Sequence, residues 1–313
     1  MVKTLENLFD TNVQIDNNLI LLDNQSKHQN QAQTNDTFSE KWKEVDKGKN
    51  QKQFFDFQHD WYLKLYGFNN ENDLKKYLSK QKIILDAGCG LGYKAAWFAE
   101  MSPESLVIGM DYSDSAIIAS QTYKHLKNLF FIKGDIAQTH IKGNSIDYVS
   151  CDQVIMHTEN PEKTFQHLSE ILKTEGEFAC YVYAKKALPR ELLDDYFRSA
   201  THNYTDEQMW EFADQLTVLG KRLSDLKVDV DVPDIPLLGI KGGKYDIQRF
   251  IYWNFLKCFW DFDLSKMTNF DWYAPSNAKR FSKQEFEQMI NKNQLQISFF
   301  HQEEACFSGR FKK

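Results

Sequence analysis

The chain has 313 residues, of which 42% are hydrophobic and 14% aromatic, and its acids outnumber its bases by 44 to 38, giving a formal net charge of −6. This is the composition of a globular protein with a sizeable core, and the acidic balance argues against a broad nucleic-acid surface, which would be basic. No apolar stretch approaches the roughly 20 residues of a membrane span, and the N-terminus lacks the apolar core of a signal peptide. We therefore expect a cytoplasmic protein without a membrane span.

The N-terminal part is polar. Residues 1–37 are rich in Asn and Gln, with one apolar run at 19–22, and residues 25–37 are typical of a linker with little capacity to fold. A dense aromatic block follows between Phe38 and Phe68. We expect this block to be helical and to pack over the edge of a sheet.

The segment 83–92, IILDAGCGLG, is the centre of the prediction. Residues 83–85 predict a strand buried on both faces, Gly88, Gly90 and Gly92 alternate through a tight turn, and residues 93–101 predict a helix. A glycine-rich turn between a buried strand and a helix lets a ligand approach the bare backbone. Alone, such a pattern is weak support for a nucleotide-type site.

Two acids sharpen this prediction. Asp86 stands directly before the glycines, where it would repel a pyrophosphate and favour a cationic ligand. Residues 106–110 predict a second strand that ends at Asp111, roughly 20 residues past the turn, where an acid is placed to bind a ribose diol.

Strands and helices then alternate, which predicts a doubly wound parallel sheet. The remaining core elements are expected as a helix at 114–125, strands at 129–132 and from 146, a helix at 160–173 and a strand at 177–183. Asn160 is the expected N-cap and Pro161 the first residue of the fourth helix, which Gly176 should stop. Ser282 is the expected N-cap of a helix that runs to residue 291, and two antiparallel strands at 295–301 and 305–311 should close the sheet.

Residues 184–279 interrupt this pattern with helices and Pro/Gly breaks, and they are too apolar and aromatic to be disordered. We expect a cap over the carboxyl ends of the strands, where ligands bind in such sheets. The insertion contains four basic residues, Lys185, Arg190, Arg249 and Lys257. If several of them converge, they suit an acidic acceptor, and if they do not, they are expected to be solvated. Trp272 and Tyr273 are expected either as an aromatic wall or as packing.

The cysteines and the metal-binding residue types give no further site. Five scattered cysteines form no CxxC pair, and reduced structural thiols are the expected state of Cys89, Cys151, Cys180, Cys258 and Cys306. No cluster has the spacing of metal ligands, so we expect no metal.

Four motifs in order resemble the class I S-adenosylmethionine (SAM) methyltransferases: ILDAGCGLG, the acid Asp111 after the second strand, KGDI at 133–136 and IDYVSCDQVIMHT at 146–158. The insertion resembles an uncharacterised bacterial group of type 11 methyltransferases, and the likeness spans roughly residues 38–312. The sequence departs from this group at two places. Met156 stands beside His157 where a pair of histidines is common, and no cysteines precede Cys89. The resemblance implies a Rossmann-like seven-stranded sheet with a mostly helical cap, SAM as cofactor, N-terminal lid helices and methyl transfer, without naming a substrate.

The resemblance and the motifs together assign the site residues. Those expected to bind SAM are Asp86, Ala87, Gly88, Cys89, Gly90, Gly92, Asp111, Tyr112, Ser113, Gly134, Asp135, Ile136, Asp152 and Gln153. Those expected to contact the acceptor are Tyr181, Tyr183, Arg190, Arg249, Trp272 and Tyr273. His157 is expected either as the general base or as a residue that only positions the cap.

Alternatives remain at this point. The favoured acceptor is a small molecule or a glycan precursor, with RNA or protein methylation, or a catalytically silent SAM-binding regulator, as the alternatives. An NAD-dependent dehydrogenase shares the glycines, but Asp86 and the antiparallel closing pair speak against it. The chain is expected to divide into four parts: a polar segment at 1–37, a SAM-binding core at 38–183, the cap at 184–279 and a closing part at 280–313. A homodimer through the cap is expected if the cap does not form the acceptor pocket.

Overall fold

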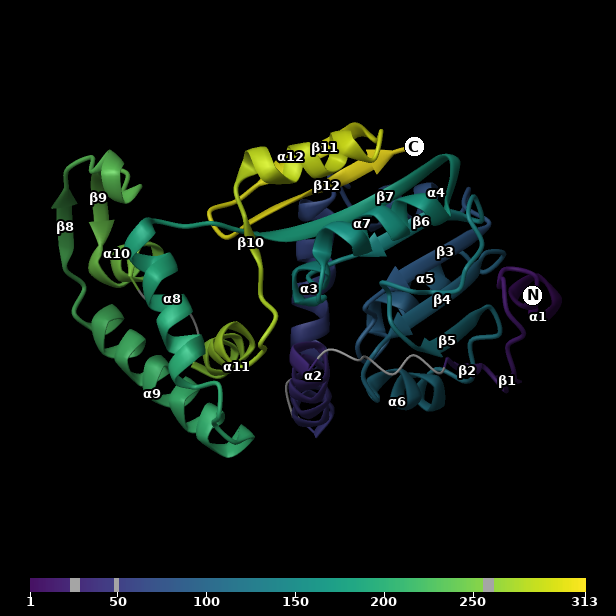
Figure 1. The fold of residues 1–313 in the computed structure, drawn as a ribbon, viewed down its shortest axis with the longest axis horizontal. Coiled ribbons are helices and arrows are strands. Elements are labelled where there is room, and N and C mark those ends of the chain that lie inside the picture. The colour runs from purple at the N-terminus through teal and green to yellow at the C-terminus, as the bar shows by residue number, and fades with distance from the viewer. Residues whose placement is uncertain (23–28, 48–50, 256–261) are drawn as a thin grey trace. The chain divides into compact units, whose positions relative to one another are not determined.

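The computed structural model describes residues 1–22, 29–47, 51–255 and 262–313 (Figure 1). The chain forms two compact units. Unit 1 contains residues 1–183 and 279–313, and unit 2 contains residues 184–278. None of the described helices is both long and apolar enough to cross a membrane.

Unit 1 is built on a ten-stranded sheet in the order β1-β2-β5-β4-β3-β6-β7-β12-β11, with β10 paired to β7. The strands are β1 (Ile15–Asp16), β2 (Leu19–Leu21), β3 (Ile83–Ala87), β4 (Leu106–Asp111), β5 (Leu129–Lys133), β6 (Ile146–Cys151), β7 (Leu172–Ala184), β10 (Arg280–Phe281), β11 (Gln296–Gln302) and β12 (Cys306–Lys312). Strands β2 to β7 along this order are parallel, and β12 runs antiparallel to both β7 and β11. Figure 1 shows β1 and β2 at one edge of the sheet and β11 and β12 at the other.

The predicted fold class, a doubly wound α/β sheet closed by an antiparallel pair, is confirmed, but the predicted number of seven strands is wrong. Strands β1 and β2 form a hairpin through Asn17, whose φ of 56° suits a tight turn, and Leu19 pairs with Phe131 of β5. Ile20 is fully buried in this edge. The apolar run at 19–22 is too short to predict a strand without its partner.

The helices of unit 1 include one where a linker was predicted. They are α1 (Val2–Glu6), α2 (Gln29–Lys47), α3 (Gln51–Leu65), α4 (Glu71–Leu78), α5 (Tyr93–Met101), α6 (Ser115–Thr122), the 3₁₀ turn η1 (Ile155–His157), α7 (Pro161–Ile171) and α12 (Lys283–Lys292). The linker prediction is wrong for residues 29–37, which lie in α2 with Thr34 and Thr37 buried. Tertiary packing supplies most helical stability, and composition does not reveal it.

The ends of α7 show one correct and one wrong prediction. The Asn160 side chain accepts a hydrogen bond from the Lys163 amide at 3.0 Å, and Pro161 is the first helical residue, as predicted. Gly176 does not end the helix, because α7 stops at Ile171 and β7 begins at once. Gly176 lies inside β7, where a Cβ would come within 2.8 Å of the Lys173 carbonyl oxygen.

Unit 2 is mostly helical, as predicted. Its elements are α8 (Leu188–Ala200), α9 (Asp206–Asp225), β8 (Asp229–Val232), the 3₁₀ turn η2 (Pro236–Leu238), β9 (Gly243–Asp246), α10 (Ile247–Asn254) and α11 (Phe262–Tyr273). A capping box between Thr205 and Gln208 starts α9, which packs on α11 through the stacked rings of Trp210 and Phe270 at 3.9 Å. The unit therefore has a core of its own.

Candidate functional site

The glycine turn joins β3 to α5 and requires residues without side chains. Gly88, Gly90 and Gly92 have φ values of +84°, +51° and +77°, in the left-handed region that favours glycine. A Cβ on Gly88 would lie 2.3 Å from Val154 Cγ2, and one on Gly90 would lie 2.6 Å from Trp42 Cζ2. Both the backbone and its neighbours therefore exclude side chains at this turn.

Asp86, the last acid before this turn, is fully buried. Neither of its carboxyl oxygens has a hydrogen-bond partner within the described part of the chain. Burial raises its pKa to about 6. Asp152 and Asp111 add to the rise, while Lys94 and the nearby Ser150 side chain oppose it. A buried carboxylate without partners is costly, so its retention points to a cationic or hydrogen-bond-donating ligand.

Asp111, at the end of β4, is held in a fixed orientation beside the turn. Its Oδ2 accepts a hydrogen bond from the Gly90 amide at 2.8 Å. Its Oδ1 accepts from the Ser113 amide at 2.9 Å and from the Ser113 hydroxyl at 2.6 Å. The carboxylate is half-buried, as is the adjacent Tyr112. The turn and the second-strand acid, predicted separately, are thus joined directly.

The motif after β5 lies at the same edge of the sheet, because β3, β4 and β5 are parallel neighbours. The Gly134 amide donates to the Asp111 carbonyl at 2.9 Å. The Asp135 carboxylate accepts from the Ala137 amide at 2.8 Å, while its burial raises its pKa. Ile136 is buried. The structure therefore brings three of the four predicted motifs together.

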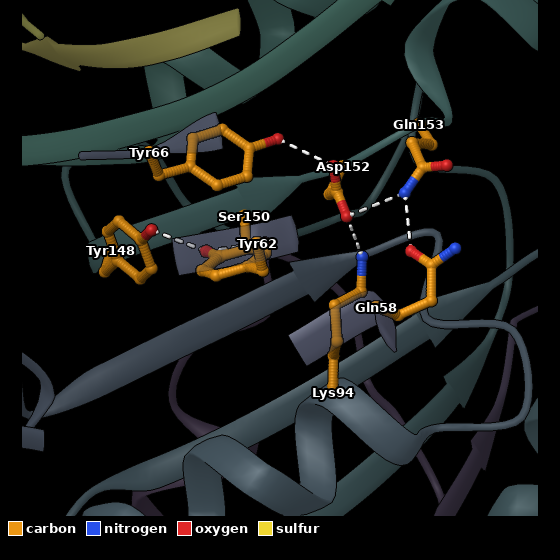
Figure 2. Close-up of polar contacts among 8 residues, drawn as sticks. All are labelled: Gln58, Tyr62, Tyr66, Lys94, Tyr148, Ser150, Asp152 and Gln153. Carbon is orange, nitrogen blue, oxygen red and sulfur yellow. Dashed lines mark hydrogen bonds and ion pairs between the residues drawn. The ribbon is translucent and has the colours of Figure 1, made fainter. Parts of the chain in front are cut away.

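The fourth motif contributes an ion pair that the sequence did not predict (Figure 2). Lys94 Nζ, from α5, lies 2.5 Å from Asp152 Oδ2, and the two side chains are 5% and 1% exposed. Asp152 Oδ1 also accepts a hydrogen bond from the Tyr66 hydroxyl at 2.9 Å. The available signal was a lysine near the start of the mostly apolar helix YKAAWFAEM. Asp152, predicted to contact the methionine moiety or the acceptor, is thus already paired inside the protein.

Helix α3 is attached to β6 and to the residues just after that strand by three side chains spaced four apart. Gln58 and Tyr62 belong to α3, and Tyr66 directly follows its last residue. Gln153 Nε2 donates to Gln58 Oε1 at 2.9 Å and to Asp152 Oδ2 at 3.2 Å. The Tyr62 hydroxyl lies 2.6 Å from that of Tyr148 and donates to Ser150 Oγ at 3.2 Å, as Figure 2 shows. Gln153 holds a positive φ of 64°, a strained conformation for a residue other than glycine.

His157 is buried in η1 and faces aromatic neighbours. Its Nε2 lies 3.3 Å from the Tyr183 hydroxyl, and its ring centroid lies 4.8 Å from that of Phe38 on α2. Tyr181 and Tyr183 point to the same side of β7, with ring centroids 6.0 Å apart. Because α2 also places Trp42 against Gly90, this helix covers both the glycine turn and His157.

Three of the predicted acceptor residues meet inside unit 2, around an acid that the sequence analysis missed. Asp194 accepts hydrogen bonds from Arg190 Nε at 2.9 Å, Trp272 Nε1 at 2.8 Å and the Tyr273 hydroxyl at 2.7 Å. Arg190 and Asp194 are both fully buried. Their spacing of four residues on α8 was the signal that could have identified the pair. Arg249 lies outside this cluster, exposed, with its guanidinium 5.0 Å from the Trp253 ring centroid.

The remaining predictions concern thiols and metals. Cys89, Cys151, Cys180 and Cys306 are buried free thiols, as predicted, while Cys258 and Lys257 lie outside the described residues. Within the described ranges, no group of three or more His, Cys, Asp or Glu side chains could hold a metal ion.

Part of the chain that carries this site is similar to known proteins. Residues 78–225 match a family model described as a methyltransferase domain. An uncharacterised methyltransferase of Schizosaccharomyces pombe is 32% identical over 114 residues, covering 34% of this chain and 41% of the relative. Sterol 24-C-methyltransferase of Saccharomyces cerevisiae is 29% identical over 111 residues, covering 34% of this chain and 29% of the relative. The matched region is thus less than half of each of these relatives.

Among solved structures, a SAM-dependent methyltransferase from Aquifex aeolicus is similar, with a TM-score of 0.42 and 12% identity over 80% of this chain and 91% of that chain. The strand order described above establishes the fold independently of this likeness.

Proposed function

We propose, starting from the methyltransferase domain in residues 78–225, that this protein is a SAM-dependent methyltransferase that binds its cofactor at the glycine turn. The observation that carries the proposal is Asp86, a fully buried carboxylate whose oxygens lack partners in the described structure. It precedes a turn whose glycines leave the backbone bare. A negative charge at this place suits the cationic SAM and opposes a pyrophosphate.

The chain's own residues would divide the binding of SAM among them. Asp111, oriented by Gly90 and Ser113, would accept hydrogen bonds from the ribose hydroxyls through its remaining lone pairs. Asp86 would offset the positive charge of the cofactor. The other residues proposed to line this site are Ala87, Gly88, Cys89, Gly90, Gly92, Tyr112, Ser113, Gly134, Asp135, Ile136, Asp152 and Gln153. Bound SAM supplies the reactive methyl carbon, and the protein positions the acceptor and excludes water.

His157 is the proposed general base. Its ring is buried between Phe38 and Tyr183, and the tyrosine hydroxyl near Nε2 can fix the orientation of the imidazole. Such an arrangement suits removal of a proton from an acceptor hydroxyl or amine. Tyr181, on the same side of β7, is proposed as a neighbouring wall of the acceptor site.

The proposed acceptor is a small molecule. The net charge of −6 disfavours a nucleic acid, and one of the relatives that match this domain is named for a sterol substrate. A glycan precursor and a homodimer remain predictions. Within unit 2, Arg190, Trp272 and Tyr273 are bound to Asp194, so we assign them first to the packing of that unit. The contact of Arg249 with the acceptor stays a prediction; its side chain is exposed.

The test combines binding and transfer. Calorimetry should show that the purified protein binds SAM, and incubation with methyl-labelled SAM and a small-molecule extract should move label into a small molecule while S-adenosylhomocysteine (SAH) accumulates. Metabolite profiling of a strain that lacks the protein should then identify the acceptor by a loss of fourteen mass units, one methylene. Absence of SAM binding by a folded protein would refute the proposal.

A further inference from the structure

Lys94 is in an unfavourable place for a lysine. It is the second residue of α5, next to the positive end of the helix dipole, and it is 4% exposed. Both the dipole and the loss of hydration penalise an ammonium group there. Helix stability therefore does not account for this residue. Nearby carboxylates must offset the free-energy cost of burying its ammonium group.

Two carboxylates provide that compensation in unequal ways. Asp152 is in direct contact with Lys94 Nζ at 2.5 Å. Asp86 has no hydrogen-bond partner among the described residues, yet it feels Lys94 electrostatically. Burial has the largest effect on the pKa of Lys94 and lowers it, but the attractions of Asp152, Tyr93 and Asp86 together outweigh burial and raise that pKa. The ammonium is therefore charged, and one ammonium between two carboxylates leaves a single negative charge.

The other charged group that acts on Asp86 is Asp111, from β4. The backbone amides of Gly90 and Ser113 hold that carboxylate beside the turn. Asp152 in turn holds Tyr66 and the side chain of Gln153, which connect α3 to the end of β6. Lys94 thus lets a buried carboxylate serve these contacts without adding its own uncompensated negative charge to the site.

We infer that Lys94 balances the charge of the cofactor site and thereby sets its preference for the cationic methyl donor over the neutral thioether product. The inference rests on the proposed function, because it requires SAM to bind beside Asp86. SAM and SAH differ by one methyl group and one positive charge. A methyl group alone gives limited discrimination, so the net charge of the site decides the ratio of the two affinities. Lys94 is a positioning residue in this role, because it acts through Asp152.

The experiment measures by calorimetry the ratio of the SAH dissociation constant to the SAM dissociation constant at pH 8, above the pKa of about 6 for Asp86. Asp152→Asn keeps the shape of the pair but leaves Lys94 unbalanced, so the ratio should fall about tenfold, as expected for one charge a few ångströms from a ligand. Lys94→Gln combined with Asp152→Asn makes the pair neutral and restores the net charge that the site has in the wild type. The ratio should then return to within about twofold of the wild type.

A purely structural role predicts the opposite order, because two changes would disturb the site more than one. A folded Asp152→Asn protein with an unchanged ratio, or a double variant no closer to the wild type than the single variant, would overturn the inference. If Asp152→Asn alone does not fold, the neutral pair is tested in its place. This double variant should keep the wild-type ratio. Adding Asp86→Asn should lower the ratio by the same factor in the wild type and in the double variant. Failure of the wild type to bind SAM would refute the proposed function instead.

Discussion

The ring of Trp42 lies directly against Gly90, so that a Cβ on the glycine would be 2.6 Å from the ring Cζ2 atom. The two residues are far apart in the sequence and belong to α2 and to the glycine turn. Lys41 Nζ lies 4.7 Å from the centroid of the same ring and adds a cation–π contact. The part of α2 that lies in the aromatic block predicted to be helical therefore covers the most sensitive part of the candidate site.

Binding of SAM at this turn should change the surroundings of Trp42. We expect a change in tryptophan fluorescence on titration with SAM, because the emission of an indole follows the polarity around it. Trp42→Phe should remove most of the change while leaving SAM affinity within about threefold of the wild type. Trp210→Phe, in unit 2, is the control and should keep the signal. A signal that survives Trp42→Phe would place the cofactor away from α2.

The glycine turn should be intolerant of a single methyl group. Gly90→Ala places a Cβ in the left-handed region and against Trp42, so SAM affinity should fall by at least tenfold, with Gly90→Val abolishing binding. The matched control is Gly143→Ala, where the nearest atom to the new Cβ is at 3.5 Å, an ordinary contact. Calorimetry on both proteins, with circular dichroism to check folding, decides the matter. Equal affinities would move the site elsewhere.

Asp111→Ala tests the ribose contact. Losing a charged acceptor of two hydroxyls should weaken SAM binding by roughly 1.5–3 kcal/mol. Asp114→Ala is the control, because Asp114 is an exposed acid just after β4 whose contact is a surface ion pair with Lys133. If the two variants bind SAM equally well, the assignment of Asp111 to the ribose is incorrect.

Asp86→Asn should stabilise the ligand-free protein while weakening its affinity for SAM. The folded-state pKa of Asp86 is about 6, above the ordinary value of 3.8, so the folded protein holds this proton more tightly than the unfolded chain. The protonated carboxyl therefore contributes to the free energy of unfolding. This contribution is fully present below pH 3.8 and is lost as the pH rises through 6. At about 1.36 kcal/mol per pKa unit, the charged group costs roughly 3 kcal/mol at pH 8.

Urea unfolding at pH 4 and pH 8 measures this effect. The variant should exceed the wild type in its free energy of unfolding at pH 8 and match it at pH 4, where the carboxyl is largely protonated in the folded protein. A variant that is less stable than the wild type at pH 8 would show that Asp86 is a structural acid, and its burial would then no longer indicate a cationic ligand.

Asp194→Ala should disrupt unit 2 and leave the cofactor site in unit 1 unaffected. The substitution strands the buried Arg190 guanidinium and removes the acceptor for Trp272 and Tyr273, at a cost of about 3–5 kcal/mol. Limited proteolysis should cleave within residues 184–278, while SAM affinity stays within about threefold. Asp195→Ala changes the exposed neighbour on the same helix and should have neither effect. Loss of SAM binding in Asp194→Ala would mean that the two units are coupled.

The sequence alone predicted those parts of the structure whose cause is local. Apolar runs bounded by glycine or acid predicted β3 and β4, and the helix Tyr93–Met101 was predicted to the residue. Ser282 and Glu285 form the capping box that starts α12, where Ser282 was the predicted cap. The cofactor turn and Asp111 were also predicted, because spacing along consecutive parallel strands places both at one edge of the sheet.

Only the tertiary structure decided which side chains meet. Lys94 pairs with Asp152 across 58 residues, and Asp194 gathers Trp272 and Tyr273 from another helix. Strand β2 forms because β5 offers it a free edge, and α2 forms where Trp42 and Phe38 have surfaces to pack on. Such contacts depend on the free energy of burial between distant segments, and neither propensity nor periodicity within one segment carries that information.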